Sequence, residues 1–185
     1  VCILCTYLLI HHHLALISSD NNRKIFINAP SFRIMWYLNK FAEKIIGKGN
    51  EDLKRILGIS FIELSQRIKT TIGAWSLMNI EMVVKYGNEI DYYSLPYEIA
   101  SILLDKEIAS LIKQTDEPII LEKILAGDFD YLLHLSYRIM RCLSNWKGEC
   151  KDGYLSELKS KDERGFKNLI NIIPLLYSKI SQYRY

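Results

Sequence analysis

The sequence predicts a mainly α-helical protein, a helical bundle with a small two-stranded antiparallel β element near its N-terminal half. Three observations support this fold class. Most of the 185 residues fall in segments whose apolar side chains recur at helical spacing between capping residues. Only two short segments have the composition of β-strands. Hydrophobic residues make up 49% and charged residues 24%, which is typical of a globular chain.

The first predicted elements are a strand and a helix. Residues Arg23–Asn28 are β-prone and end at Ala29-Pro30. Ser31 can cap a helix that runs to Ile46, where Gly47 is a natural stop. The apolar residues that recur at helical spacing within this helix are Phe32, Met35, Trp36, Phe41 and Ile45.

A second helix is predicted to begin at Asn50 and to carry one apolar stripe. Gly58 can interrupt this helix, in which case Ser60 and Glu63 form a capping box that restarts it. The stripe consists of Leu53, Leu57, Phe61, Leu64, Ile68 and Ile72.

A second strand follows, because residues 78–85 alternate with the period of a β-strand. Met78, Ile80, Met82 and Val84 occupy one face, and Gly87-Asn88 ends the segment. Antiparallel pairing with residues 24–28 would give the two-stranded element.

After Asp91 the sequence predicts helices almost throughout. Gly148 and Gly153 bracket one loop, and Pro174 is expected to kink the last helix. The residues expected to cap or begin these helices are Ser94, Asp116, Asp128 and Asp162.

Two parts are distinguished in the chain: residues 1–22, an apolar N-terminal segment, and residues 23–185, the helical bundle domain. The apolar run Val1–Ile17 is too short to span a membrane and is interrupted by histidines. It has neither the basic start nor the cleavage site of a signal peptide. The four cysteines do not resemble a secreted disulfide framework. We therefore expect a cytoplasmic location and no membrane partner.

The pair Cys2-x-x-Cys5 has the spacing of half a zinc site, since two thiolates from one turn can share a tetrahedral ion. The alternative is two small buried thiols. Candidates for the missing ligands within the chain are His11, His12, His13, Cys142 and Cys150.

The C-terminal third is basic. From Arg138 to Tyr185 there are ten Lys or Arg and five Asp or Glu, a net charge of +5, so the rest carries −2 of the total of +3. Tyr137, next to Arg138, and Trp146, next to Lys147, are interleaved with this run, and cations with aromatics are typical of single-strand binding. Alternatively, these aromatics are core and the charges only solubilise. The candidate residues are Arg138, Arg141, Lys147, Lys151, Lys159, Lys161, Arg164 and Lys167.

No catalytic signature is present: the chain has no Gly-rich phosphate loop, no G-x-S-x-G and no H-E-x-x-H. We therefore predict no enzyme and no catalytic residue.

The order of several short sequence motifs resembles that in the C-terminal part of the large subunit of type I CRISPR surveillance (Cascade) complexes, in the branch named for its CXXC–CXXC zinc motif. The resemblance covers nearly the whole chain. These motifs are Cys2-x-x-Cys5, the run 25–32 (IFINAPSF), the run 35–40 (MWYLNK), Trp75, the run 91–96 (DYYSLP) and the run 104–109 (LDKEIA).

The resemblance implies a non-catalytic role in RNA-guided antiviral defence. Cys2 and Cys5 would be the second half of a zinc ribbon, so zinc would bind only if an upstream cysteine pair is present. Val1 would be an internal position or a GTG start codon. The implied partners are other CRISPR subunits, guide RNA and target DNA, with a separate helicase-nuclease recruited to cut. The alternative from the residues alone is a helical protein–protein interaction module with no nucleic-acid binding.

Overall fold

A computed structural model of the chain describes residues 3, 16–18, 23–46, 53–67 and 77–183. The segment 1–22, which the sequence sets apart, therefore lies mostly outside the described residues.

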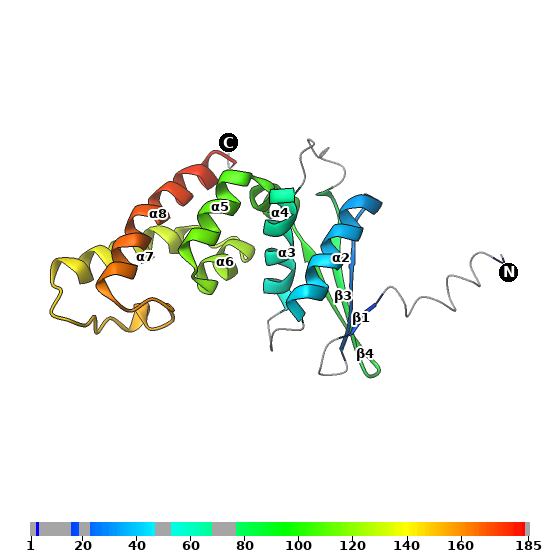
Figure 1. The fold of residues 1–185 in the computed structure, drawn as a ribbon, viewed down its shortest axis with the longest axis horizontal. Coiled ribbons are helices and arrows are strands. Elements are labelled where there is room, and N and C mark those ends of the chain that lie inside the picture. The colour runs from blue at the N-terminus through cyan, green and yellow to red at the C-terminus, as the bar shows by residue number, and fades with distance from the viewer. Residues whose placement is uncertain (1–2, 4–15, 19–22, 47–52, 68–76, 184–185) are drawn as a thin grey trace. The chain divides into compact units, whose positions relative to one another are not determined.

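The described chain forms two units, which meet in sequence between Tyr97 and Glu98 (Figure 1). The first unit holds four strands and two helices, and the second holds the remaining helices together with Ser65–Arg67. The first unit contains β1 (Ile17–Ser18), β2 (Arg23–Asn28), α2 (Phe32–Ile46), α3 (Leu53–Arg67), β3 (Ile80–Tyr86) and β4 (Glu89–Leu95). The second contains α4 (Tyr97–Leu104), α5 (Lys106–Thr115), α6 (Pro118–Leu125), α7 (Asp130–Ser144), the 3-10 helix η3 (Gly153–Leu155) and α8 (Glu163–Ser181).

The predicted fold class is wrong in its β content. The first unit contains a four-stranded antiparallel sheet in the order β1-β2-β3-β4, so the described chain is an α+β protein with seven α-helices. The predicted strands at 23–28 and 78–85 correspond to β2 and β3, and they pair antiparallel as expected. The missed strand β4 forms a hairpin with β3 across Gly87-Asn88, and Gly87 has the positive φ of 58° that such a tight turn needs. Ser94, expected to cap a helix, lies within β4.

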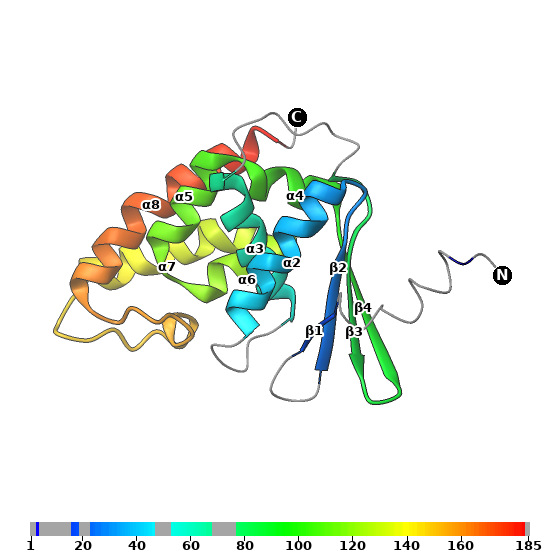
Figure 2. The ribbon, with the colours of Figure 1, turned by 45° about the vertical axis from the view of Figure 1, so that its right-hand side comes forward.

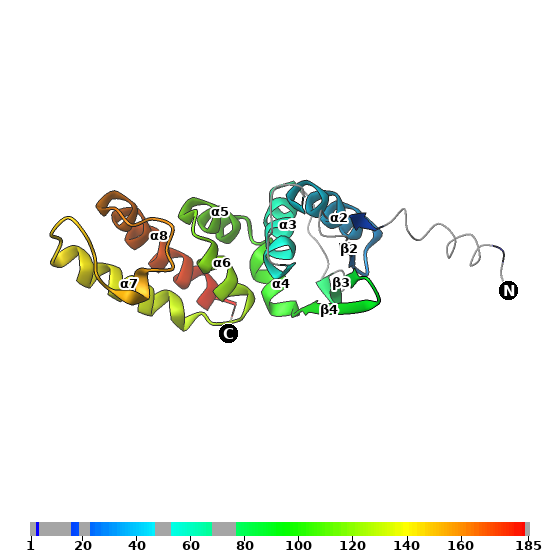
Figure 3. The same cartoon turned by 90° about the horizontal axis from the view of Figure 1, so that it is seen from below.

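The two faces of the sheet differ in burial, and one of them is covered by helices. Ile25 and Ile27 of β2, and Ile80, Met82 and Val84 of β3, are buried. Helices α2 and α3 lie on one side of the strands, as Figures 2 and 3 show. The residues that alternate with these buried positions lie on the opposite face of the sheet.

Helix α2 buries a different stripe from the one expected. Its buried residues are Ile34, Leu38, Phe41, Ala42 and Ile46. Of the expected stripe only Phe41 is buried, whereas the side chain of Phe32 is 76% exposed.

Helix α3 runs through Gly58 without a break. The hydroxyl of Ser60 donates to the carbonyl of Ile56 inside the helix, so Ser60 is not an N-cap. The expected core positions Leu57, Phe61 and Leu64 are fully buried. The expected start at Asn50 and the end of the stripe at Ile68 and Ile72 lie outside the described residues.

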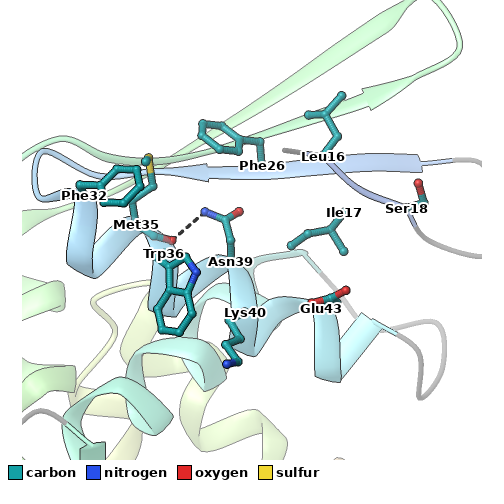
Figure 4. A pocket seen from close by; sticks show the side chains of 10 residues that line it. All are labelled: Leu16, Ile17, Ser18, Phe26, Phe32, Met35, Trp36, Asn39, Lys40 and Glu43. Carbon is teal, nitrogen blue, oxygen red and sulfur yellow. Dashed lines mark hydrogen bonds between the residues drawn. The ribbon is translucent and has the colours of Figure 1, made fainter. Parts of the chain in front are cut away.

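β1 pairs only with Lys24 and Ile25, and beyond them the outer edge of β2 is hydrogen-bonded by a side chain of α2. The backbone N–H of Ile27 donates to Oδ1 of Asn39 at 2.9 Å, and Nδ2 of Asn39 donates to the carbonyl of Ile27 at 2.6 Å. Nδ2 of Asn39 also donates to the carbonyl of Met35 at 2.8 Å (Figure 4). The amide of Asn39 thus substitutes for a neighbouring strand. Beside it lies a groove of about 710 Å³ lined partly by Phe32 and Trp36.

We expect Asn39→Ala to lower the free energy of unfolding by about 1–2 kcal/mol, because both backbone groups of Ile27 lose their partner in a half-buried position. Chemical denaturation followed by circular dichroism measures this. Lys44→Ala on the exposed side of α2 serves as the control and should change the stability little. Equal stability of the two variants would show that solvent replaces the amide of Asn39.

In the second unit, α8 packs against α7 and α5. Asp162 caps α8 as predicted, with its carboxylate accepting from the N–H of Gly165. The single helix expected from Ser94 is instead two helices, since Asp105 caps α5 by accepting from the N–H groups of Glu107 and Ile108. Asp116 does not cap α6 but ends α5 in the left-handed conformation. Helix α7 begins at Asp130, two residues after its expected cap.

Candidate nucleic-acid interface

The eight predicted nucleic-acid-binding residues fall into two groups in the second unit. Arg138 and Arg141 lie on α7, and Lys147 and Lys151 lie in the loop that follows it. Lys159 and Lys161 precede α8, and Arg164 and Lys167 lie in its first turns.

Four of these cations are engaged with carboxylates. Arg138 pairs with Asp152 at 3.1 Å, and Lys151 pairs with Glu149 at 2.9 Å. Lys159 pairs with Asp116, and Lys167 pairs with Glu163 one helical turn away. The other four form no ion pair with any residue in the described part of the chain: Arg141, Lys147, Lys161 and Arg164.

Two adjacent cavities bring part of the set together. Arg138, Arg141 and Lys151 line a polar cavity of about 420 Å³. Lys151 and Lys161 line a second cavity of about 240 Å³. Both cavities are bordered by the loop Cys150–Gly153, so four cations gather around one short segment. We call Arg138, Arg141, Lys151 and Lys161 the basic cluster.

A disulfide holds this loop against α7. Cys142, near the end of α7, is bonded to Cys150, and their Cα atoms are 5.9 Å apart. The bond fixes the position of Lys151 relative to Arg141, because Lys151 follows Cys150 directly and Arg141 precedes Cys142. The two cysteines are therefore not thiolate ligands in this structure, although both were candidates for the zinc site.

Arg138 is positioned by the loop as well as by its helix. Its guanidinium lies 5.6 Å from the ring centroid of Tyr154, and that ring stacks on Tyr131 at 5.3 Å. The N–H of Tyr154, which donates to the Asp152 carboxylate, and the guanidinium of Arg138 together lower the pKa of Asp152. Asp152 thus stays charged; its ion-pair partner is Arg138, and the more distant charge of Arg141 also contributes to its lowered pKa.

A buried carboxylate holds the backbone of the two residues that precede Lys161. Glu117 is only 3% exposed, and its two oxygens accept from the N–H groups of Lys159 at 2.7 Å and Ser160 at 2.8 Å. Nothing in the sequence near Glu117 indicates this role, because its partners are 42 and 43 residues away.

The two aromatic residues of the predicted interface behave differently. Tyr137 is 61% exposed on α7, one turn before Arg141. Trp146 packs edge-to-face on the buried Phe166, with ring centroids 5.9 Å apart. Tyr137 is therefore accessible to a ligand, whereas Trp146 fixes the loop to α8.

The predicted metal ligands Cys2 and Cys5, and the histidines 11–13, lie outside the described residues. Within the described ranges there is no group of three or more His, Cys, Asp or Glu that could hold a metal ion. None of the helices described is long and apolar enough to cross a membrane.

Comparisons with protein-family models, with curated proteins and with solved structures found no match to this chain.

The sequence analysis missed the loop residues that organise the cluster. Asn145 and two carboxylates, Glu149 and Asp152, line the larger cavity beside the cations. Asp152 begins a short 3-10 helix by accepting from the N–H of Tyr154, and an Asp before Gly-Tyr-Leu is a signal for such a cap.

Proposed function

We propose that the chain is a nucleic-acid-binding, non-catalytic part of a type I CRISPR RNA-guided effector complex. In this proposal the basic cluster contacts the phosphate backbone of a strand. The observation that carries the nucleic-acid part is the gathering of four cations along the two cavities that share the loop Cys150–Gly153.

The chemistry of the cluster suits phosphate contact without base reading. Arg141 and Lys161 border the cavities and form no ion pair with a described residue, so they can neutralise phosphates. The exposed ring of Tyr137 lies one turn from Arg141, where it can stack on an unpaired base. These features favour a single strand over a duplex.

The assignment to a CRISPR complex rests on the sequence resemblance alone. In that setting the partners would be neighbouring subunits, guide RNA and target DNA, and cleavage would belong to another protein. Zinc would be held by Cys2 and Cys5 only together with an upstream cysteine pair.

A second candidate function, a protein–protein interaction module, is favoured by one observation. Leu133, Tyr137 and Met140 are 46%, 61% and 48% exposed on the outer side of α7, at helical spacing. Such a stripe can pack against a helix of another subunit. This use is compatible with phosphate contact by Arg141 but does not require it.

Fluorescence anisotropy of a labelled single-stranded DNA, titrated with the chain at low salt, tests the proposal. We expect saturable binding that weakens as salt is added, and weaker binding to a duplex of the same sequence. Absence of binding at low salt would reject the nucleic-acid proposal and favour the protein-interaction module.

A further inference from the structure

The face of the sheet opposite α2 and α3 carries a row of side chains across three strands. The register pairs Phe26 of β2 with Val83 of β3, and Val83 with Tyr92 of β4. Paired residues in an antiparallel sheet point to the same face. Phe26 and Val83 are half-exposed, and Tyr92 is 59% exposed.

The next row on this face is basic. Lys24 is paired with Lys85, and the third member of the row is Ile90, which is 67% exposed. Like charges directly opposite one another destabilise a sheet. Neither lysine forms an ion pair with a residue in the described ranges, so an anion placed over this row would relieve their repulsion.

The carboxylate on this face is already engaged. Glu81 of β3 accepts a hydrogen bond from the hydroxyl of Tyr92, which raises the pKa of that hydroxyl. Glu81 lies on the far side of the Phe26–Tyr92 row from the lysines, because it pairs with Asn28 and Ser94. The aromatic row therefore lies between a basic row and a row that carries the Glu81 carboxylate.

We propose that this face, defined by Lys24, Phe26, Val83, Lys85 and Tyr92, is a stacking platform for single-stranded nucleic acid. The rings of Phe26 and Tyr92 are two strands apart, about 10 Å from backbone to backbone, so each can take a separate base. Lys24 and Lys85 in the neighbouring row are placed to contact the phosphates of the same nucleic-acid strand. The inference rests on the proposed function and deepens it, because it adds a second surface and makes bases, not only phosphates, part of what is bound.

The test compares two labelled oligonucleotides of equal length and charge, one of thymidine and one of abasic sites, by anisotropy. The chain is expected to bind the thymidine oligonucleotide about tenfold more tightly, since base–aromatic stacking is lost with the abasic one. In the variant Phe26→Ala/Tyr92→Ala this preference should shrink to the part that Tyr137 supplies, while abasic binding stays unchanged. Tyr86→Ala, which removes an exposed aromatic on the other face of β3, is the matched control and should keep the preference.

Equal affinity of the unmodified chain for both oligonucleotides would overturn the platform but leave phosphate binding by the basic cluster intact. A preference of the same size in the double variant and in the unmodified chain would also overturn it. If neither oligonucleotide binds, the proposed function fails together with the platform.

A second double variant separates a loss of binding from a loss of folding. Lys24 and Lys85 are exposed and repel each other, so Lys24→Gln/Lys85→Gln should not lower the thermal unfolding midpoint and should raise it slightly. It should also lower the slope of log Kd against log salt by about 1.4, at about 0.7 per phosphate contact on a single strand. An unchanged slope would contradict the placement of phosphates over the lysine row.

Discussion

Reversing the charge of Arg141 and Lys161 is expected to weaken binding of single-stranded DNA on the order of 10- to 100-fold at low salt, because two phosphate contacts become two repulsions. Both side chains border the cavities around the loop Cys150–Gly153. Neither forms an ion pair with a described residue, so Arg141→Glu/Lys161→Glu breaks no such pair. Anisotropy of labelled single-stranded DNA measures the change.

The control changes net charge equally at other places. Lys44 on α2 and Lys106 at the start of α5 are exposed. Lys44→Glu/Lys106→Glu should therefore bind DNA nearly as tightly as the unmodified chain. If both double variants lose affinity by the same factor, binding depends on overall charge, and the basic cluster is not the interface.

Glu117→Ala is expected to lower the free energy of unfolding by about 2 kcal/mol, the largest stability effect we predict for a single polar side chain here. The change removes the acceptor of the N–H groups of Lys159 and Ser160, and it leaves both donors without their protein partner. Because Lys161 follows directly, the loss should also loosen the basic cluster and weaken DNA binding. Denaturant unfolding and anisotropy on the same sample measure both effects.

Glu122→Ala is the control for Glu117→Ala, because Glu122 lies in α6, the helix that directly follows Glu117, but is exposed. Glu122→Ala should be close to neutral. Equal stability of the two variants would show that water replaces the Glu117 carboxylate and that the segment before α8 does not depend on it.

Local signals in the sequence predict the elements whose burial is regular. β3 alternates buried and half-buried side chains, and Asp162 starts α8 where its cap was expected. β4 could not be found in this way, because it is an edge strand with most side chains exposed on both faces, and it shows no alternation. β1, with two residues, is too short to carry any pattern.

The candidate site was predictable only where it is local in sequence. Arg138 and Arg141 lie one helical turn apart, so their shared surface follows from spacing. The anchoring of the loop by Glu117 depends on contacts across more than 40 residues, which no local pattern encodes. The sheet platform depends on the register of β4, so it could not be found once that strand was missed.

The salt dependence of DNA binding tests the central claim, phosphate contact by the basic cluster, most directly. The slope of log Kd against log salt would be measured for the unmodified chain and for Arg141→Glu/Lys161→Glu. Losing two phosphate contacts on a single strand should lower the slope by about 1.4. Identical slopes for the two proteins would contradict the claim, because Arg141 and Lys161 would then release no counterions on binding.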